Sequence, residues 1–212
     1  MRPIPLITGE IYHIYSKSIQ GFKIFNRPED FSRMLALIQY CQWEKLPLPF
    51  SHFIQSNKIQ QLGFKTHLAQ ASAGSARIVQ IIAYCIMETH VHFILKQLKD
   101  GGISSFIQKM FSGYSQYFNL LHNRQGPLWQ SRFGNRYIED LGDLINTSHY
   151  VHANPVKDMG LCSPGDWVYS SYKEYCESLP KNNCICQWRN VIPINSIDYQ
   201  ESMKVYLLTS GK

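Results

Sequence analysis

The chain has 212 residues, enough for one well-buried domain with extensions and short for two domains. Hydrophobic residues make up 44% of it and aromatic residues 13%, which argues against a disordered chain. The formal net charge of +6 favours a polyanionic partner, nucleic acid before a membrane. No run of eighteen apolar residues occurs and the N-terminus lacks the apolar core of a signal peptide, so we expect a cytoplasmic protein.

The six cysteines are scattered through the sequence, and Cys85 lies inside an apolar segment. We therefore expect reduced thiols rather than a disulfide framework. Cys184 and Cys186, with Cys176 nearby, are a weak candidate for a zinc site, because structural zinc ligands usually come in pairs spaced by two to four residues.

The first third of the chain predicts one strand and one helix. Residues 10–16 alternate and are rich in β-branched and aromatic types, which is typical of a strand. A basic loop follows, and Pro28 opens a helix with an apolar face that ends before residues 46–49. Residues 46–76 read as an insertion, in which residues 50–55 could form a short strand and another part should be helical.

Residues 77–87 are apolar nearly throughout and predict a central strand, followed by a turn at Glu88 and Thr89. The strand that returns carries two histidines, His90 and His92. Successive strand residues point to opposite faces, so both histidines share one face and Val91 turns into the core. Two imidazoles on a rigid strand can bind a divalent metal, but they do not fill its coordination shell.

The second half predicts a helix over 103–121, a basic and aromatic loop over 122–133, a strand over 135–139 and a helix from Asp140 or Asp143 through Ala153. The order βαββαβ implies a ferredoxin-like antiparallel α+β fold with helices on one face and an additional helix bearing Tyr150. In this topology the first and third strands are central, so the histidine strand lies in the middle of the sheet.

Tyr150 and Asn154 lie four residues apart, hence one turn apart on the same face of the last helix. We expect Pro155 to limit this helix and to leave Asn154 at a frayed end. The amide oxygen of Asn154 could complete a metal site with the two histidines. The tyrosine could then face a phosphate bound to the metal.

The loop 122–133 mixes basic, amide and aromatic side chains, which suits single-stranded nucleic acid because arginines hold phosphates and rings stack on bases. Each basic residue taken alone is more often a solvated surface charge. The candidate DNA contacts are Lys17, Lys23, Arg27, Arg124, Trp129, Gln130, Arg132 and Arg136.

Three ordered motifs together resemble the REP-associated tyrosine transposases, which belong to the HUH single-tyrosine, IS200-like transposases. The three motifs are Met87 with His90-Val91-His92, the loop 126–133, and the segment 150–156. The later segment 166–172 also resembles the C-terminal part of these proteins. The resemblance spans about residues 8–176, so we assign residues 1–176 to a catalytic domain and 177–212 to a C-terminal extension. The chain departs from the family's pattern at two places. Before the first histidine, Glu88-Thr89 stands where the family often has Pro-Asn or Pro-Asp, and after the first strand, Ser16-Lys17-Ser18 stands where the family usually has Asn-Arg-Gly.

This resemblance implies metal-dependent nicking and joining of single-stranded DNA, on hairpin-forming repeats. Tyr150 would be the nucleophile that forms a 5′-phosphotyrosine. His90, His92 and Asn154 would hold a divalent metal, Mg²⁺ or Mn²⁺, and the protein would act as a monomer or homodimer without binding membranes.

Two other hypotheses remain open from the sequence. One is a domesticated nucleic-acid-binding protein that keeps the fold without cutting DNA. The other is a metal-dependent phosphodiesterase in which Tyr150 is a core residue and water attacks the phosphate. The presence of all four site residues favours the transposase-like activity.

Overall fold

One four-stranded sheet organises the molecule. The computed structural model describes residues 5–130, 132–177, 179–180 and 183–210, so Ser131 of the second motif lies outside the described residues. The strands are β1 (Ile11–Lys17), β2 (Val79–Ile86), β3 (His90–Gln97) and β4 (Gly134–Tyr137), in the order β2-β3-β1-β4. Each neighbouring pair is antiparallel. The ferredoxin-like topology is confirmed, with the first and third strands in the centre.

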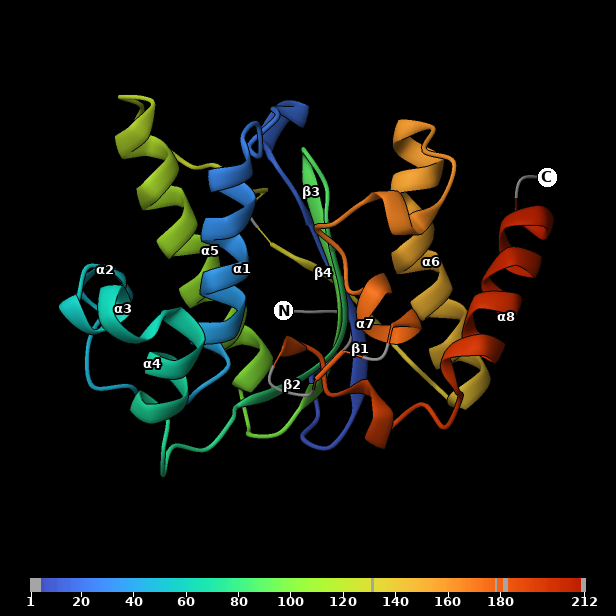
Figure 1. Ribbon diagram of the computed structural model, residues 1–212. Helices are drawn as coiled ribbons and strands as arrows, with labels where there is room; N and C mark the ends of the chain where they lie inside the picture. The colour runs from blue at the N-terminus through green and yellow to red at the C-terminus, as the bar shows by residue number, and fades with distance from the viewer. Residues whose placement is uncertain (1–4, 131, 178, 181–182, 211–212) are drawn as a thin grey trace.

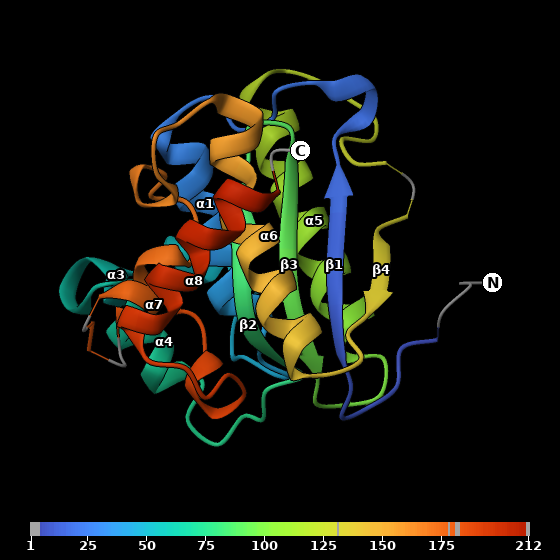
Figure 2. The ribbon, with the colours of Figure 1, turned by 90° about the vertical axis from the view of Figure 1, so that its right-hand side faces the viewer.

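Helices cover both faces of this sheet (Figures 1 and 2). One face is covered by α1 (Pro28–Cys41) and α5 (Gly102–Leu121), and the other by α6 (Leu141–Met159), α7 (Tyr172–Cys176) and α8 (Ser196–Thr209). Single 3₁₀ turns occur at Ile19–Gly21, Pro164–Asp166 and Trp188–Asn190. No helix within the described ranges is long and apolar enough to cross a membrane.

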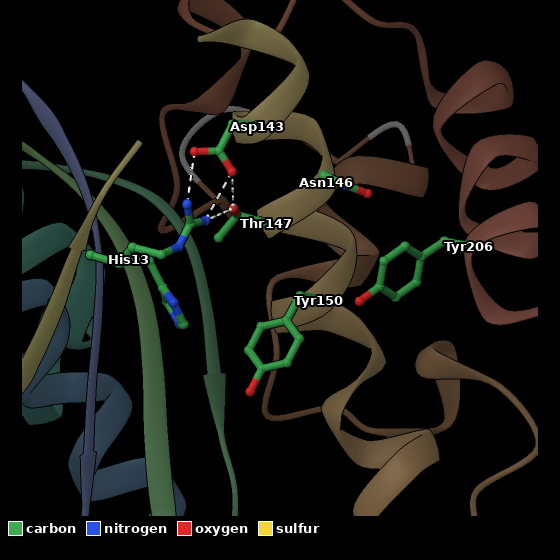
Figure 3. Close-up of a pocket in the computed structure, with 7 residues that line it drawn as sticks. His13, Asp143, Asn146, Thr147, Tyr150 and Tyr206 are labelled. Carbon is green, nitrogen blue, oxygen red and sulfur yellow. Dashed lines mark hydrogen bonds and ion pairs between the residues drawn. The ribbon is translucent and has the colours of Figure 1, made fainter. Parts of the chain in front are cut away.

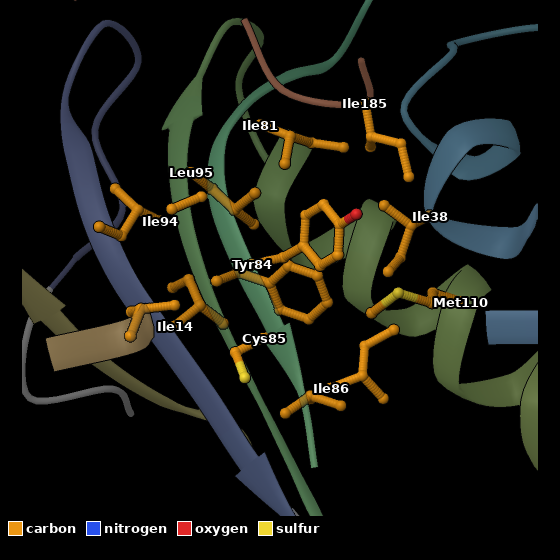
Figure 4. Close-up of a cluster of buried hydrophobic side chains, with 14 of the residues drawn as sticks. Ile14, Ile38, Ile81, Tyr84, Cys85, Ile86, Ile94, Leu95, Met110 and Ile185 are labelled. Atoms are coloured by element: carbon orange, nitrogen blue, oxygen red, sulfur yellow. The ribbon is translucent and has the colours of Figure 1, made fainter. Parts of the chain in front are cut away.

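The hydrophobic core lies mainly between the sheet and the helix pair α1 and α5. Val91, Phe93 and Leu95 alternate along β3 and are almost completely buried. Figure 4 shows Tyr84 and Ile86 of β2 on this side, near Ile38 of α1 and Met110 of α5. Burial of each such side chain stabilises the fold by about 1.5–3 kcal/mol. Packing of this face against α1 and α5 therefore holds the sheet rigid for the residues on its other face.

The segment 46–76 is helical where it has regular structure. It forms α2 (Phe50–Ile54), α3 (Asn57–Leu62) and α4 (Phe64–Ala71), beside α1 in Figure 1. The expected strand over 50–55 is therefore wrong. Phe50 and Phe53 lie three residues apart on one helix face and both contact the ring of Tyr40 on α1, which favours helix over strand. That the segment is an insertion stays a prediction.

Helix α6 continues past Pro155, so the expectation of a frayed end near Asn154 is wrong. The helix ends at Met159 and is closed by Gly160 in the left-handed conformation. A proline inside a helix removes one backbone hydrogen bond. Burial of residues 151–155 against the sheet and neighbouring helices compensates for that loss. As a result Asn154 is held in regular helix, and Asp158 follows one turn later.

The weak zinc candidate is also wrong. Within the described ranges, no three His, Cys, Asp or Glu side chains are grouped so that they could hold a metal ion. Cys176, Cys184 and Cys186 are free thiols in the structure, and Cys186 is buried. The metal site predicted from His90, His92 and Asn154 differs in kind, because one of its ligands is an amide.

Candidate active site

The two histidines of β3 lie on the sheet face that α6 covers. His90 and His92 are 8% and 5% exposed. Across the strand pair, Lys17 of β1 is opposite His90, and Tyr15 is opposite His92. His13, two residues before Tyr15, points to the same face. The alternation predicted from the sequence thus places both imidazoles on one rigid surface.

Each of the two imidazole rings has a polar partner. Nδ1 of His92 lies 3.0 Å from Nε2 of His13. Nδ1 of His90 lies 3.0 Å from the hydroxyl of Thr89, and its Nε2 lies 3.5 Å from a carboxylate oxygen of Asp158. Thr89 stands in the turn where the family often has Asn or Asp, and it still supplies an oxygen beside the first histidine.

Helix α6 brings Tyr150 over the histidines. The phenol ring meets the ring of His92 edge-on at 5.5 Å and 88°, and that of His13 at 5.6 Å and 75°. Tyr150 is 39% exposed, whereas Asn154 is 5% exposed. The amide Nδ2 of Asn154 donates to the carbonyl of Tyr150 over 2.8 Å. All four residues singled out from the sequence therefore meet on one face of the sheet.

The electrostatic surroundings keep these groups uncharged at neutral pH. Burial lowers the pKa of His90, and a hydrogen bond with Asn154 and the charge of Asp158 act in the opposite direction. Burial also holds the pKa of His92 well below its ordinary value. Burial raises the pKa of Tyr150, which is therefore a protonated phenol. Neutral imidazoles keep a free lone pair, as metal binding requires.

The donor set fits a divalent cation. It combines two neutral imidazoles with an amide, and the Asp158 carboxylate lies beside His90. Mixed nitrogen and oxygen donors suit several first-row divalent metals. The Nδ1 atom of each histidine also lies beside a polar partner, His13 for His92 and Thr89 for His90. Such partners are usual around metal-binding imidazoles. His90, His92 and Asn154 are the residues that would hold the ion.

Two cavities adjoin the site. One, of about 320 Å³, is shown in Figure 3 and is lined by His13, Arg136, Asp143, Asn146, Thr147, Tyr150 and Tyr206. In that view Tyr150 extends from α6 and Tyr206 from α8. The other, of about 380 Å³, is lined by Met87, Glu88, Thr89, His90, Asp158 and Met159. Space for a substrate therefore lies beside both the phenol and the first histidine.

Of the candidate DNA contacts, Lys17 and Arg136 lie beside the site. Lys17 is exposed directly across from His90, and its charge helps to lower the pKa of both His90 and His92 after burial, the main cause. Arg136 on β4 donates to both carboxylate oxygens of Asp143, over 2.8 and 2.9 Å, and also to the hydroxyl of Thr147. This ion pair joins β4 to the first turn of α6.

Three other basic candidates already have partners in the protein. Lys23 pairs with Glu88 at 2.7 Å, and Arg27 pairs with buried Asp30 at 3.1 Å. Arg124 donates to the side chain of Asn119 and the carbonyl of Pro127. Both basic loops are held at the end of the sheet that carries His90. Backbone hydrogen bonds join the segment 18–25 to Glu88 and Thr89, and Gln130 to Lys17.

Trp129 does not offer the stacking surface that the loop composition predicts. Its side chain is only 8% exposed and stacks on Phe111 at 4.0 Å. A large aromatic ring next to an apolar helix face gains more by burial than by exposure, so it supports the loop from inside. Its loop neighbours Gln130 and Arg132 are exposed and keep their predicted availability to DNA.

Sequence reasoning missed three residues of the site. His13 was read as part of the first strand without a role, although its alternation with Tyr15 and the central position of that strand could have placed it beside His92. Asp158 was missed because the helix was expected to end near Pro155. Tyr206 belongs to the extension beyond the resemblance, and no local pattern indicates that α8 reaches this cavity.

An antiparallel sheet with two histidines on a central strand, under a helix that carries a tyrosine, is the arrangement that the resemblance implies. Residues 58–154 match the model of a family described as "Transposase IS200 like". This match includes both histidines, Tyr150 and Asn154, and it confirms the resemblance to this family.

The chain is also similar to a "Putative REP-associated tyrosine transposase" of Haemophilus influenzae, with 30% identity over 104 residues. The alignment spans 44% of this chain and 58% of that relative. A solved structure described as a REP-associated tyrosine transposase bound to a REP hairpin superposes with a TM-score of 0.55 at 15% identity, covering 82% of this chain and 84% of the other. This likeness shows the shared fold.

Proposed function

We propose that the protein nicks and rejoins single-stranded DNA through a 5′-phosphotyrosine intermediate, as a metal-dependent transposase. The observation that carries the proposal is the convergence of the Tyr150 phenol with His90, His92 and Asn154 on one face of the sheet. A nucleophile beside a set of metal ligands, next to cavities, is the constellation expected for phosphoryl transfer.

In the proposed reaction, the hydroxyl oxygen of Tyr150 attacks the phosphorus of the scissile phosphodiester. The bond from phosphorus to the 3′ oxygen breaks, and the phosphate stays attached to the tyrosine and to the 5′ end of the downstream strand. The phenol proton passes to solvent, which the 39% exposure of Tyr150 permits, and the departing 3′ oxygen takes up a proton. Rejoining reverses these steps with a 3′-hydroxyl as nucleophile, so no external energy source is required.

A bound divalent cation would stabilise the charge that develops on the phosphate and orient it for in-line attack. The protein contributes the position of the phenol. Tyr150 sits mid-helix on α6, and the pair of Arg136 and Asp143 joins the start of that helix to β4. Fixing a nucleophile within reach of a bound phosphate supplies much of the rate enhancement in such reactions.

The proposed substrate is a DNA hairpin with an adjoining single strand. Its support is the net charge of +6, the two basic loops beside His90, and the fold shared with a transposase solved on a REP hairpin. Phosphate contacts supply most of the affinity in such complexes, so binding should weaken steeply with salt.

The test is incubation of a labelled hairpin oligonucleotide with the protein and Mg²⁺ or Mn²⁺, followed by denaturing gel electrophoresis. We expect a covalent protein–DNA adduct that disappears in Tyr150→Phe. Tyr15→Phe is a matched control, because Tyr15 is a similarly exposed tyrosine near His92.

The other outcomes assign the protein elsewhere. Binding of the hairpin without any cut in wild type supports a domesticated binding protein. Cleavage that persists in Tyr150→Phe supports a phosphodiesterase in which water attacks. Either result contradicts the tyrosine-transfer proposal.

A further inference from the structure

His13 lies outside the part of the chain that matches the family model, yet it makes a buried contact with a proposed metal ligand. Its Nε2 is 3.0 Å from Nδ1 of His92. The two rings are nearly parallel, at 18° with centroids 5.2 Å apart. They are 7% and 5% exposed, so water does not readily replace either partner in this hydrogen bond.

We infer that His13 is a positioning residue for His92: it accepts the Nδ1 proton of His92 and so leaves the Nε2 lone pair of His92 for a divalent cation. This inference rests on the proposed metal site and extends it to the strand β1. His13 itself is not expected to touch the metal.

The tautomers follow from counting protons. A neutral imidazole carries one proton, on either Nδ1 or Nε2. If His13 donated to His92, the proton of His92 would sit on Nε2 and that atom could not bind a cation. If His92 donates, its Nε2 is free and His13 carries its own proton on Nδ1. Metal binding through Nε2 therefore requires the second arrangement.

The contact also fixes the ring plane of His92. Tyr150 and His90 meet that ring edge-on, at 5.5 and 5.1 Å, and His13 stacks along it. His90 has a comparable but local arrangement, since the hydroxyl beside its Nδ1 belongs to the preceding residue Thr89. His92 instead depends on a residue 79 positions away in the sequence. Outer partners of this kind typically change metal affinity by about ten- to a hundredfold.

Two variants of His13 separate positioning from packing. His13→Gln keeps a carbonyl oxygen that can accept the proton of His92, whereas His13→Leu keeps bulk without an acceptor. Mn²⁺ affinity is measured by electron paramagnetic resonance titration, with thermal unfolding to verify the fold. We expect His13→Leu to bind Mn²⁺ about tenfold or more weakly, and His13→Gln to stay within about threefold of wild type.

Tyr15→Leu is the matched control, because Tyr15 lies on the same face of β1 and near the His92 ring without a hydrogen bond to it. We expect its Mn²⁺ affinity to equal that of wild type. Equal affinity in wild type and His13→Leu overturns the inference. So does a loss in His13→Gln as large as that in His13→Leu.

A second measurement needs no substitution and covers the case in which His13→Leu does not fold. Long-range ¹H–¹⁵N spectra of the wild-type protein with Mg²⁺ report the tautomer of each histidine. We expect a proton on Nδ1 of both His92 and His13, and a proton on Nε2 of His92 overturns the inference. If wild type binds no Mn²⁺, the proposed function itself fails; if it binds and the His13 variants match it, only the positioning role fails.

Discussion

The two faces of strand β3 differ sharply although they alternate residue by residue. Val91 and Phe93 are fully buried against α1 and α5, in an apolar environment where shape and volume matter. His90 and His92 are nearly as buried under α6, but each ring has a polar partner: His92 has His13 on β1, and His90 has the preceding residue Thr89. One face of β3 therefore stabilises the fold, while the other uses that rigidity to hold neutral imidazoles beside a phenol.

The largest expected effect is the loss of DNA cleavage when a histidine of the polar face is replaced. His92→Ala should reduce metal-dependent cleavage of a hairpin oligonucleotide by about a thousandfold or more, since metal assistance is worth several kcal/mol of barrier. Its free energy of unfolding should fall by about 1–3 kcal/mol, because buried His13 loses its hydrogen-bond partner. Cleavage rates and urea unfolding measure the two effects, and a variant that cuts normally refutes the metal assignment.

The neighbouring residue should behave in the opposite way. Phe93 is fully buried and meets Phe106 edge-on at 6.0 Å. Phe93→Ala should lower the free energy of unfolding by about 3–5 kcal/mol, from lost burial and the remaining cavity. Activity per folded molecule should change little. Urea denaturation checks the stability, and a loss below about 1 kcal/mol contradicts the assignment of this face to the core.

A pH titration tests whether the buried histidines of β1 and α6 are held neutral. Burial lowers the pKa of His13 and His149 to about 4 and that of His152 to about 3. Between these values and the ordinary pKa of about 6.5, the unfolded chain binds protons that the folded chain does not. Stability should therefore be full above about pH 6.5 and decline toward pH 4, by up to about 3 kcal/mol for each of these histidines.

Urea unfolding at a series of pH values measures this decline. His149→Gln is the informative variant, because glutamine can keep a hydrogen bond to Ser202 but does not titrate. Its stability should depend less steeply on pH than that of wild type. An unchanged slope would show that His149 is not held neutral by burial.

The smallest effect on stability and DNA binding is expected at β4, the edge strand that carries Arg136. The pair of Arg136 and Asp143 is partly exposed, with side chains 47% and 25% accessible, so Arg136→Ala should change stability by no more than about 1 kcal/mol. Its hairpin affinity should fall by about tenfold or less if Arg136 contacts a phosphate. Arg136→Lys should keep part of that affinity because it keeps the charge, and fluorescence anisotropy at fixed salt measures both.

The sequence predicted the apolar face well because alternation and helical periodicity are local signals. The strand order, both central strands and the shared face of His90 and His92 followed from these patterns. Residues 50–55 were misread because a short apolar run does not distinguish strand from helix. The contacts of Phe50 and Phe53 with the Tyr40 ring, which require a helix, are seen only in the folded structure.

The polar face was predicted less completely because its contacts are long-range. Tyr150 and Asn154 came from one helical turn, but Asp158 was hidden by the rule that proline limits a helix. The extension 177–212 contributes Tyr199, whose hydroxyl lies 2.7 Å from Nδ1 of His152 on α6. Nothing local in the sequence indicates that contact, and Trp129 shows the converse, a residue of suitable type that packing places out of reach.

The central claim is that one divalent cation binds between β3 and α6. Its most direct test is anomalous diffraction from a crystal soaked in Mn²⁺. We expect a single strong peak at ligand distance from imidazole nitrogens of His90 and His92 and from the side-chain oxygen of Asn154, beside the Tyr150 phenol. A soaked crystal with no peak there, or with manganese bound only elsewhere, would contradict the account.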